Sequence, residues 1–146
     1  RGFFFTPHIH KNTDHTPLPA RFLTPHQTQA SPEAYATVVA GMRLAVTKGT
    51  ATELNRTSYP VCGKTGTAEN AGKDHSAFIG FAPMNHPKIA IAVYIEHGGF
   101  GADMAAPIAG LIMEEYLKGR LSPRSLATAK RLERMQTLEK RVSSTK

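Results

Sequence analysis

Residues 62–95 read CGKTGTAENAGKDHSAFIGFAPMNHPKIAIAVYI, and this stretch decides the fold. It contains three short segments of apolar or β-branched residues, separated by polar turns at 70–74 and 83–87. Turns this short join neighbouring antiparallel strands, whereas parallel strands need a longer crossover. The stretch therefore predicts a three-stranded antiparallel meander. Extended chain is expected from Thr57 onward, because residues 57–61 are largely β-branched or aromatic.

The third predicted strand has one face of large residues and one face of small residues, since successive side chains of a strand point to opposite faces. The small residues are Ala90 and Ala92. A helix can approach closest over small side chains, so we expect a helix to lie over the alanine face. The large residues of the other face are Ile89, Ile91, Val93 and Ile95.

Helices are expected on both sides of this stretch in the sequence. The run Ser31-Pro32-Glu33 is typical of a helix start and predicts a helix over 32–48. Apolar residues at helical spacing predict a second helix over 103–117, ended by Gly119, and a third from Ser122 onward. Four prolines in the first thirty residues exclude a long helix or a central strand there. The predicted fold class is α+β, an antiparallel sheet flanked by helices.

The charge of the chain is concentrated at one end. The 146 residues carry a formal charge of +7, but 120–146 hold eight basic and two acidic side chains. Residues 1–119 hold ten basic and nine acidic side chains, so the body does not look like a nucleic-acid-binding surface. The single Cys62 excludes an internal disulfide, and no apolar run is long enough to span a bilayer.

The run Gly63-Lys64-Thr65-Gly66-Thr67 is the most distinctive motif, and two chemistries compete for it. A phosphate-binding P-loop needs a glycine where Ser58 stands, and it leads directly into a helix, whereas a polar turn and a strand follow here. The alternative is the Lys-Thr-Gly element of active-site serine acyltransferases, which lies on a strand beside the substrate. A cation and hydroxyl groups at a strand edge can bind a peptide carboxylate, and a glycine lets the substrate backbone approach closely.

The neighbouring sequence favours the second chemistry. Together with the motif, it closely resembles the end of the transpeptidase domain of class B penicillin-binding proteins, over about residues 1–119. Within that family it is most similar to the elongation-specific penicillin-binding protein 2 group. The segments that carry the resemblance are 63–69, 75–83, 89–93, Glu96-His97-Gly98-Gly99, 105–108, Gly41-Met42-Arg43, Gly49-Thr50-Ala51 and Thr6-Pro7-His8-Ile9.

The resemblance implies the fold shared by penicillin-binding proteins and serine β-lactamases, a five-stranded sheet with the Lys-Thr-Gly strand at one edge. It implies acylation of a serine by a D-Ala-D-Ala stem peptide, a reaction that β-lactams trap. Carried over to this chain, Lys64 tunes the electrostatics of the cleft and Gly66 admits the substrate. Thr65 and Thr67 bind the substrate carboxylate, and the N–H of Thr67 completes the oxyanion hole. Lys64 and Thr67 are the catalytic candidates.

The resemblance also implies partners and a location. The partners are the stem peptide, β-lactams, a glycosyltransferase and proteins of the elongation complex, with no nucleic acid. The location is the periplasmic face of the inner membrane, with an N-terminal anchor helix that these residues lack. No cofactor is expected, and no spacing of histidine, cysteine or carboxylate residues indicates a metal site.

Two elements that this family needs are missing. The chain has no Ser-x-Asn, and its only Ser-x-x-Lys, at 143–146, lies in a polar terminus. We therefore expect 1–121 to be the C-terminal part of a transpeptidase domain without its catalytic serine, inactive alone, followed by a basic helical tail at 122–146. An unpaired strand edge in such a part predicts self-association.

Two other functions stay open on the sequence. A serine β-lactamase or a D,D-carboxypeptidase would share the Lys-Thr-Gly strand. A basic module that binds nucleic acid or a membrane surface through 120–146 is the alternative outside enzymes.

Overall fold

The computed structural model describes residues 2–8, 17–55 and 58–143, the stretch 136–143 by its backbone alone. The chain forms two compact units, 1–38 and 39–146, and each is described by itself.

The first unit contains only short elements in its described part. Strand β1 (Phe3–Phe4) pairs antiparallel with β2 (His26–Gln27), and α1 (Ala20–Leu23) is a single turn. These elements agree with the prolines, which allow neither a long helix nor a central strand. Helix α2 (Pro32–Thr47) then begins in this unit and ends in the second one.

The start of α2 confirms the predicted cap. The backbone N–H of Ala34 donates to the Ser31 hydroxyl at 3.2 Å, which satisfies one of the free donors of the first turn. A hydrogen bond from its own backbone N–H, and then one from the Ser31 hydroxyl, lower the pKa of Glu33, which stands next to the positive end of the helix dipole.

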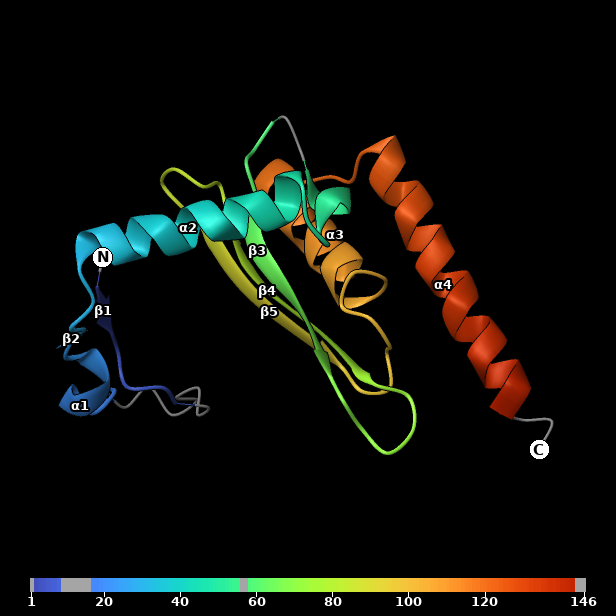
Figure 1. Ribbon diagram of the computed structural model, residues 1–146, viewed down its shortest axis with the longest axis horizontal. Helices are drawn as coiled ribbons and strands as arrows, with labels where there is room; N and C mark the ends of the chain where they lie inside the picture. Colours follow the sequence, from blue (N-terminus) through green and yellow to red (C-terminus); the bar gives the residue numbers. More distant parts are fainter. Residues whose placement is uncertain (1, 9–16, 56–57, 144–146) are drawn as a thin grey trace. The chain divides into compact units, whose positions relative to one another are not determined.

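The second unit is built on the predicted meander. Strands β3 (Cys62–Ala68), β4 (His75–Ala82) and β5 (Ile89–Ile95) form an antiparallel sheet in the order β3-β4-β5 (Figure 1). The expected start of the first strand was wrong within the described residues, because 58–61 lie outside the sheet. Pro60 has no N–H to give to a ladder, and its carbonyl instead accepts the N–H of Met84 at 2.7 Å.

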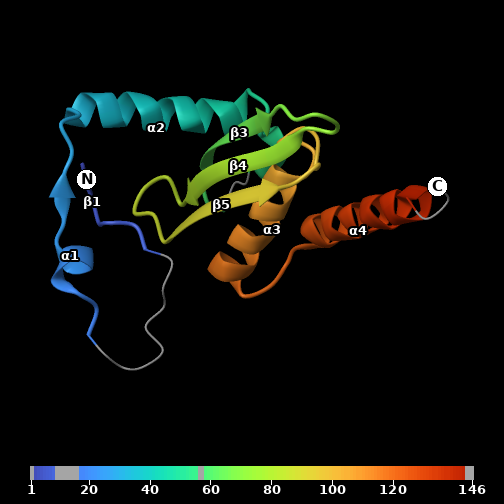
Figure 2. The same cartoon turned by 90° about the horizontal axis from the view of Figure 1, so that it is seen from below.

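Helix α3 (Ala105–Lys118) covers one face of this sheet (Figure 2). The expectation that a helix lies over the alanine face of β5 was wrong: Ala90 and Ala92 are exposed, and the helix packs on the large residues of the opposite face. The small side chains that allow the close approach belong to the helix itself, which presents Ala105 and Ala109 to the sheet. The strand residues packed against this core are Ile89, Ile91, Val93 and Ile95.

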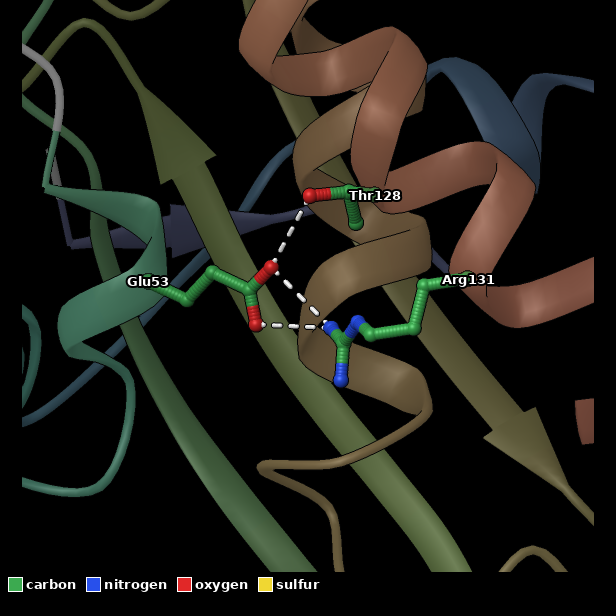
Figure 3. A network of polar contacts seen from close by, with 3 residues as sticks. All are labelled: Glu53, Thr128 and Arg131. Atoms are coloured by element: carbon green, nitrogen blue, oxygen red, sulfur yellow. Dashed lines mark hydrogen bonds and ion pairs between the residues drawn. The ribbon is translucent and has the colours of Figure 1, made fainter.

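The last element, α4 (Pro123–Ser143), confirms the predicted third helix and is attached to the body by its first half. Ser125 and Leu132 are buried there. The short helix η1 (Thr52–Leu54) supplies Glu53, whose carboxylate accepts from Thr128 at 3.1 Å and forms an ion pair with Arg131 at 3.0 Å (Figure 3).

In the described part of the chain, no helix is both long enough and apolar enough to cross a membrane.

Candidate active site

The Lys-Thr-Gly motif lies on an edge strand. Within the described residues, β3 pairs with β4 on one side only, and its other edge has no strand beside it. The register sets Thr65 opposite Phe78 and Gly66 opposite Ala77. An edge strand keeps backbone donors and acceptors unpaired along its open side, so a peptide ligand could bind there.

The structure brings the predicted site residues together on this strand but divides them between its two faces. Alternation along β3 puts Lys64 and Gly66 on one face, Thr65 and Thr67 on the other. Lys64 and Thr67 are exposed, and Thr65 and Gly66 are half-buried. The Lys64 ammonium donates to the carbonyl of Thr65 at 2.7 Å, so its positive charge stays at the motif.

Thr65 has a hydroxyl partner outside the motif. Its Oγ1 lies 2.6 Å from Oγ1 of Thr50, which stands between α2 and η1. A threonine hydroxyl has one donor and two acceptor positions, so Thr65 can accept from Thr50 and still donate to a ligand. Thr50 had no role in the sequence prediction, although Gly49-Thr50-Ala51 belongs to the segments that resemble the family.

Packing behind β3 fixes the upstream end of the motif. A side chain on Gly80 would approach the Cys62 carbonyl to 2.7 Å and the Phe78 ring to 2.7 Å, and one on Gly63 would overlap the same ring. The Phe78 side chain is buried and therefore occupies the space that these two glycines leave open. At Gly66 the situation differs, because a methyl group would meet only the Cβ of Ala77, at 3.4 Å.

Cys62, at the start of β3, is a buried packing residue. Burial raises the pKa of its thiol, and the nearby Arg43 guanidinium opposes that rise. Arg43 itself donates to the Val61 carbonyl and to Oδ1 of Asn55, each at 2.9 Å. The neutral, buried thiol has none of the properties of a nucleophile.

The residues after the motif tie the far ends of the strands together. Nδ1 of His75 accepts the backbone N–H of His97 at 2.9 Å, which caps the turn that follows β5. The N–H of Gly99 donates to the Asp74 carbonyl at 2.8 Å. The His75 ring and the Asp74 carbonyl therefore hold the turn after β5 in place.

Together these groups can bind an anionic ligand at the strand edge. They offer a cation, hydroxyl donors and an open strand edge to a peptide carboxylate. None of the described residues of the motif strand is an activated nucleophile. Among the described residues, no three histidine, cysteine or carboxylate side chains gather in a way that could hold a metal ion.

Comparison with families of known proteins gives one match over most of the chain. Residues 1–114 match the penicillin binding protein transpeptidase domain. Among curated relatives, the peptidoglycan D,D-transpeptidase MrdA of Haemophilus influenzae is 36% identical over 80 residues, which are 44% of this chain and 12% of that protein. The peptidoglycan D,D-transpeptidase PbpA of Mycobacterium tuberculosis is 40% identical over 70 residues, 40% of this chain and 14% of that protein. The chain thus spans only about an eighth of these relatives' length.

Solved structures agree with these relatives. PBP2 of Pseudomonas aeruginosa, in complex with WCK 5153, superposes with a TM-score of 0.58 at 34% identity, over 68% of this chain and 23% of that one. Penicillin-binding protein A of M. tuberculosis, as an imipenem acyl-enzyme complex, gives a TM-score of 0.58 at 32% identity, over 65% of this chain and 22% of that one. The predicted α+β fold is therefore confirmed by structures as well as by the sheet and helices described above.

Proposed function

Because the chain belongs to the family of penicillin-binding protein transpeptidase domains, we propose that it supplies the Lys-Thr-Gly side of the active site of a peptidoglycan D,D-transpeptidase. The observation that carries this proposal is the position of the motif on an edge strand with one open side. The names of the relatives support the reaction, since the curated relatives compared above are peptidoglycan D,D-transpeptidases.

The substrate carboxylate binds to the motif in this proposal. Thr65 and Thr67 donate hydroxyl hydrogen bonds to it, and the Lys64 charge favours an anion at the strand edge. Thr50 orients the Thr65 hydroxyl through the 2.6 Å contact, so that the Thr65 proton points to the ligand. Gly66 leaves room for the substrate backbone to pair with the open edge.

The N–H of Thr67 then serves the chemical step. A serine attacks the carbonyl of the penultimate D-Ala, and the oxygen of that carbonyl takes up negative charge that a backbone N–H can stabilise. The terminal D-Ala leaves with a proton, and the acyl group later passes to an amine of a neighbouring stem peptide. In a β-lactam the leaving group stays tethered, so the acyl-enzyme persists.

The nucleophile lies outside these 146 residues. The chain has no Ser-x-Asn, and its Ser-x-x-Lys at 143–146 falls largely beyond the described residues, with no side chain of it described. The sheet face that carries Lys64 has room for another layer, because Ile79 and Tyr94 on that face are 57% and 59% exposed. An element carrying the serine would cover these apolar side chains and stand next to Lys64.

The remaining assignments follow from the same proposal. Residues 1–121 form the C-terminal part of the transpeptidase domain, and 122–146 form an attached basic helix. The protein works at the periplasmic face of the inner membrane, with β-lactams as ligands and with glycosyltransferase and elongation-complex proteins as partners. The structure of penicillin-binding protein A compared above is an imipenem acyl-enzyme complex, which supports β-lactam binding.

The alternatives receive less support. A serine β-lactamase or a D,D-carboxypeptidase would need the same strand, but the curated relatives compared above are transpeptidases by name. A basic binding module would need its cations free, and Arg131 is instead engaged by Glu53. We assign α4 to the structural support of the body.

Labelling with a fluorescent penicillin tests the proposal. The isolated chain of 146 residues is expected to form no covalent adduct, whereas the complete gene product that contains it forms one that hydroxylamine releases. A stable, hydroxylamine-sensitive adduct on the isolated chain would contradict the missing nucleophile. A complete gene product that never labels would contradict the transpeptidase assignment itself.

A further inference from the structure

A serine on the strand next to the motif holds the structure that lies behind it. Ser76 on β4 is opposite Thr67 in the register, and its side chain is 0% exposed. Its hydroxyl donates to the Phe100 carbonyl at 3.1 Å and accepts the Ala105 N–H at 3.0 Å. One buried hydroxyl therefore joins the motif's neighbouring strand, the loop after β5 and the first turn of α3.

That loop, residues 98–101, lies directly against the backbone of the motif. A methyl group on Gly101 would lie 2.5 Å from the carbonyl oxygen of Gly66 and 3.0 Å from its nitrogen, and it would overlap the Ala77 carbonyl. A methyl group on Gly98 would come within 2.9 Å of Cβ of Ser76. Only glycines allow the loop to lie this close to the two strands.

Backbone hydrogen bonds also hold the loop at its two ends. The N–H of Gly98 donates to the Ile95 carbonyl at 3.2 Å, and the N–H of Ala106 donates to the Gly101 carbonyl at 2.8 Å. Strand β5 and helix α3 therefore hold the two ends of the loop, and Ser76 holds the loop between these ends. In the described part of the chain, β3 has a hydrogen-bonded neighbour on one side only, so this loop limits how far Gly66 can move out of the sheet plane.

We propose that Ser76 is a positioning residue for acyl transfer: it fixes the 98–101 loop beneath Gly66 and thereby sets the place of the Thr67 N–H. This inference rests on the proposed function. Without the Ser76 hydroxyl, the Phe100 carbonyl and the buried Ala105 N–H lose a partner, and the loop shifts to satisfy them. The ligand carboxylate still binds to the motif hydroxyls, whereas the oxyanion donor moves out of line.

The test uses the complete gene product and a fluorescent penicillin, with binding and acylation measured separately. Ser76→Ala is expected to reach the same final extent of labelling as the wild type. This final extent measures the number of folded active sites. The variant's acylation rate constant at saturating penicillin falls about 10- to 100-fold, as displaced catalytic groups typically cause. The concentration for half-saturation changes by less than about threefold, because the carboxylate contacts remain.

A matched control separates positioning from stability. Ser125 is also 0% exposed and bonded through its hydroxyl, but it lies at the start of α4. Ser125→Ala is expected to lower the melting temperature and leave the acylation rate constant per labelled site unchanged. Ser76→Cys is slightly larger but keeps a weaker hydrogen-bonding group, so it is expected to lose less than Ser76→Ala, and it replaces that variant if Ser76→Ala does not fold.

The outcomes distinguish the two levels of the proposal. A wild-type acylation rate constant in Ser76→Ala, or in Ser76→Cys where it stands in, would overturn the positioning role and leave the transpeptidase assignment intact. An equal loss in Ser125→Ala would also overturn it, since the effect would then follow stability alone. A wild-type protein that does not label would instead overturn the proposed function.

Discussion

Single glycines along the motif have different physical roles. Gly80 on β4 has the Cys62 carbonyl and the Phe78 ring within 2.8 Å of the place where a Cβ would stand. Gly66, one strand away, has only ordinary contact there, with Cβ of Ala77 at 3.4 Å. The fold therefore requires glycine at position 80 but not at position 66, where we propose that the ligand requires it.

Alanine substitutions at these two glycines separate folding from function. Gly80→Ala is expected to lower the free energy of unfolding by about 1–3 kcal/mol, as overpacking of a core does. Gly66→Ala is expected to leave the free energy of unfolding unchanged within about 0.5 kcal/mol, while penicillin labelling of the complete gene product slows. Denaturant titration gives the first quantity and labelling kinetics give the second. Wild-type labelling by Gly66→Ala would show that the substrate does not approach this glycine.

The Cys62 thiol makes stability depend on pH at the alkaline end. Its pKa is raised above the ordinary 9.0 by burial, so the unfolded chain ionises at a lower pH than the folded chain. The contribution of Cys62 is therefore fully present below about pH 9 and is lost as the pH rises through the folded pKa. Between neutral and strongly alkaline pH, we expect the free energy of unfolding to fall less steeply with pH in Cys62→Ala than in the wild type. The same alkaline slope in both proteins would contradict this role.

At the scale of helices and strands, short sequence patterns predicted the elements that form from neighbouring residues. The Ser31 cap, the helix over 32–48 and the meander were read correctly, since they depend on neighbouring residues. The side of β5 that a helix covers could not be read from the strand, because the small residues that allow close packing belong to α3. The prediction needed the shape of the partner as well as that of the strand.

The candidate site was also predicted only in part. The motif on β3 was found because its residues are consecutive, and the resemblance gave them roles. Thr50 and Ser76 were missed as site residues, because each acts through a contact between distant parts of the chain, at 15 and 24 residues of separation from Thr65 and Phe100. Only the fold brings such hydroxyls together.

The attachment of α4 depends on the contacts in Figure 3, and a double-mutant cycle measures them. Side chains of Arg131 and Glu53 are 46% and 32% exposed, so solvent weakens their attraction. Glu53→Gln combined with Arg131→Gln is expected to give a coupling energy of about 0.3–1 kcal/mol, smaller at high salt. A coupling energy of zero at low salt would mean that the buried residues of α4 hold it without this ion pair.

At the largest scale, the central feature is the sheet of the second unit, of which α3 covers one face while the other is exposed within the described residues of that unit. The part of the chain that superposes on P. aeruginosa PBP2 covers 23% of that chain. Ile79 and Tyr94 are exposed on the uncovered face, and within the described residues β3 and β5 each have an edge without a neighbouring strand. Both features favour association of the isolated chain.

Light scattering tests this association. The isolated chain is expected to form dimers or larger species as its concentration rises, because pairing edges and apolar faces become buried. Ile79→Lys with Tyr94→Lys is expected to reduce association, since it places charge on the uncovered face. A strictly monomeric wild-type chain at all concentrations would contradict the prediction.

The most direct test of the central claim is the acylation of the complete gene product when the motif lysine is removed. Lys64→Ala is expected to slow acylation by penicillin at least about 100-fold, in the range seen when an electrostatic contact to a transition state is lost. Lys88→Ala is the matched control, because Lys88 is an exposed lysine in the turn between β4 and β5, outside the motif strand. It is expected to acylate at the wild-type rate. If Lys64→Ala and Lys88→Ala acylate equally fast, the motif strand does not form part of the penicillin-reactive centre.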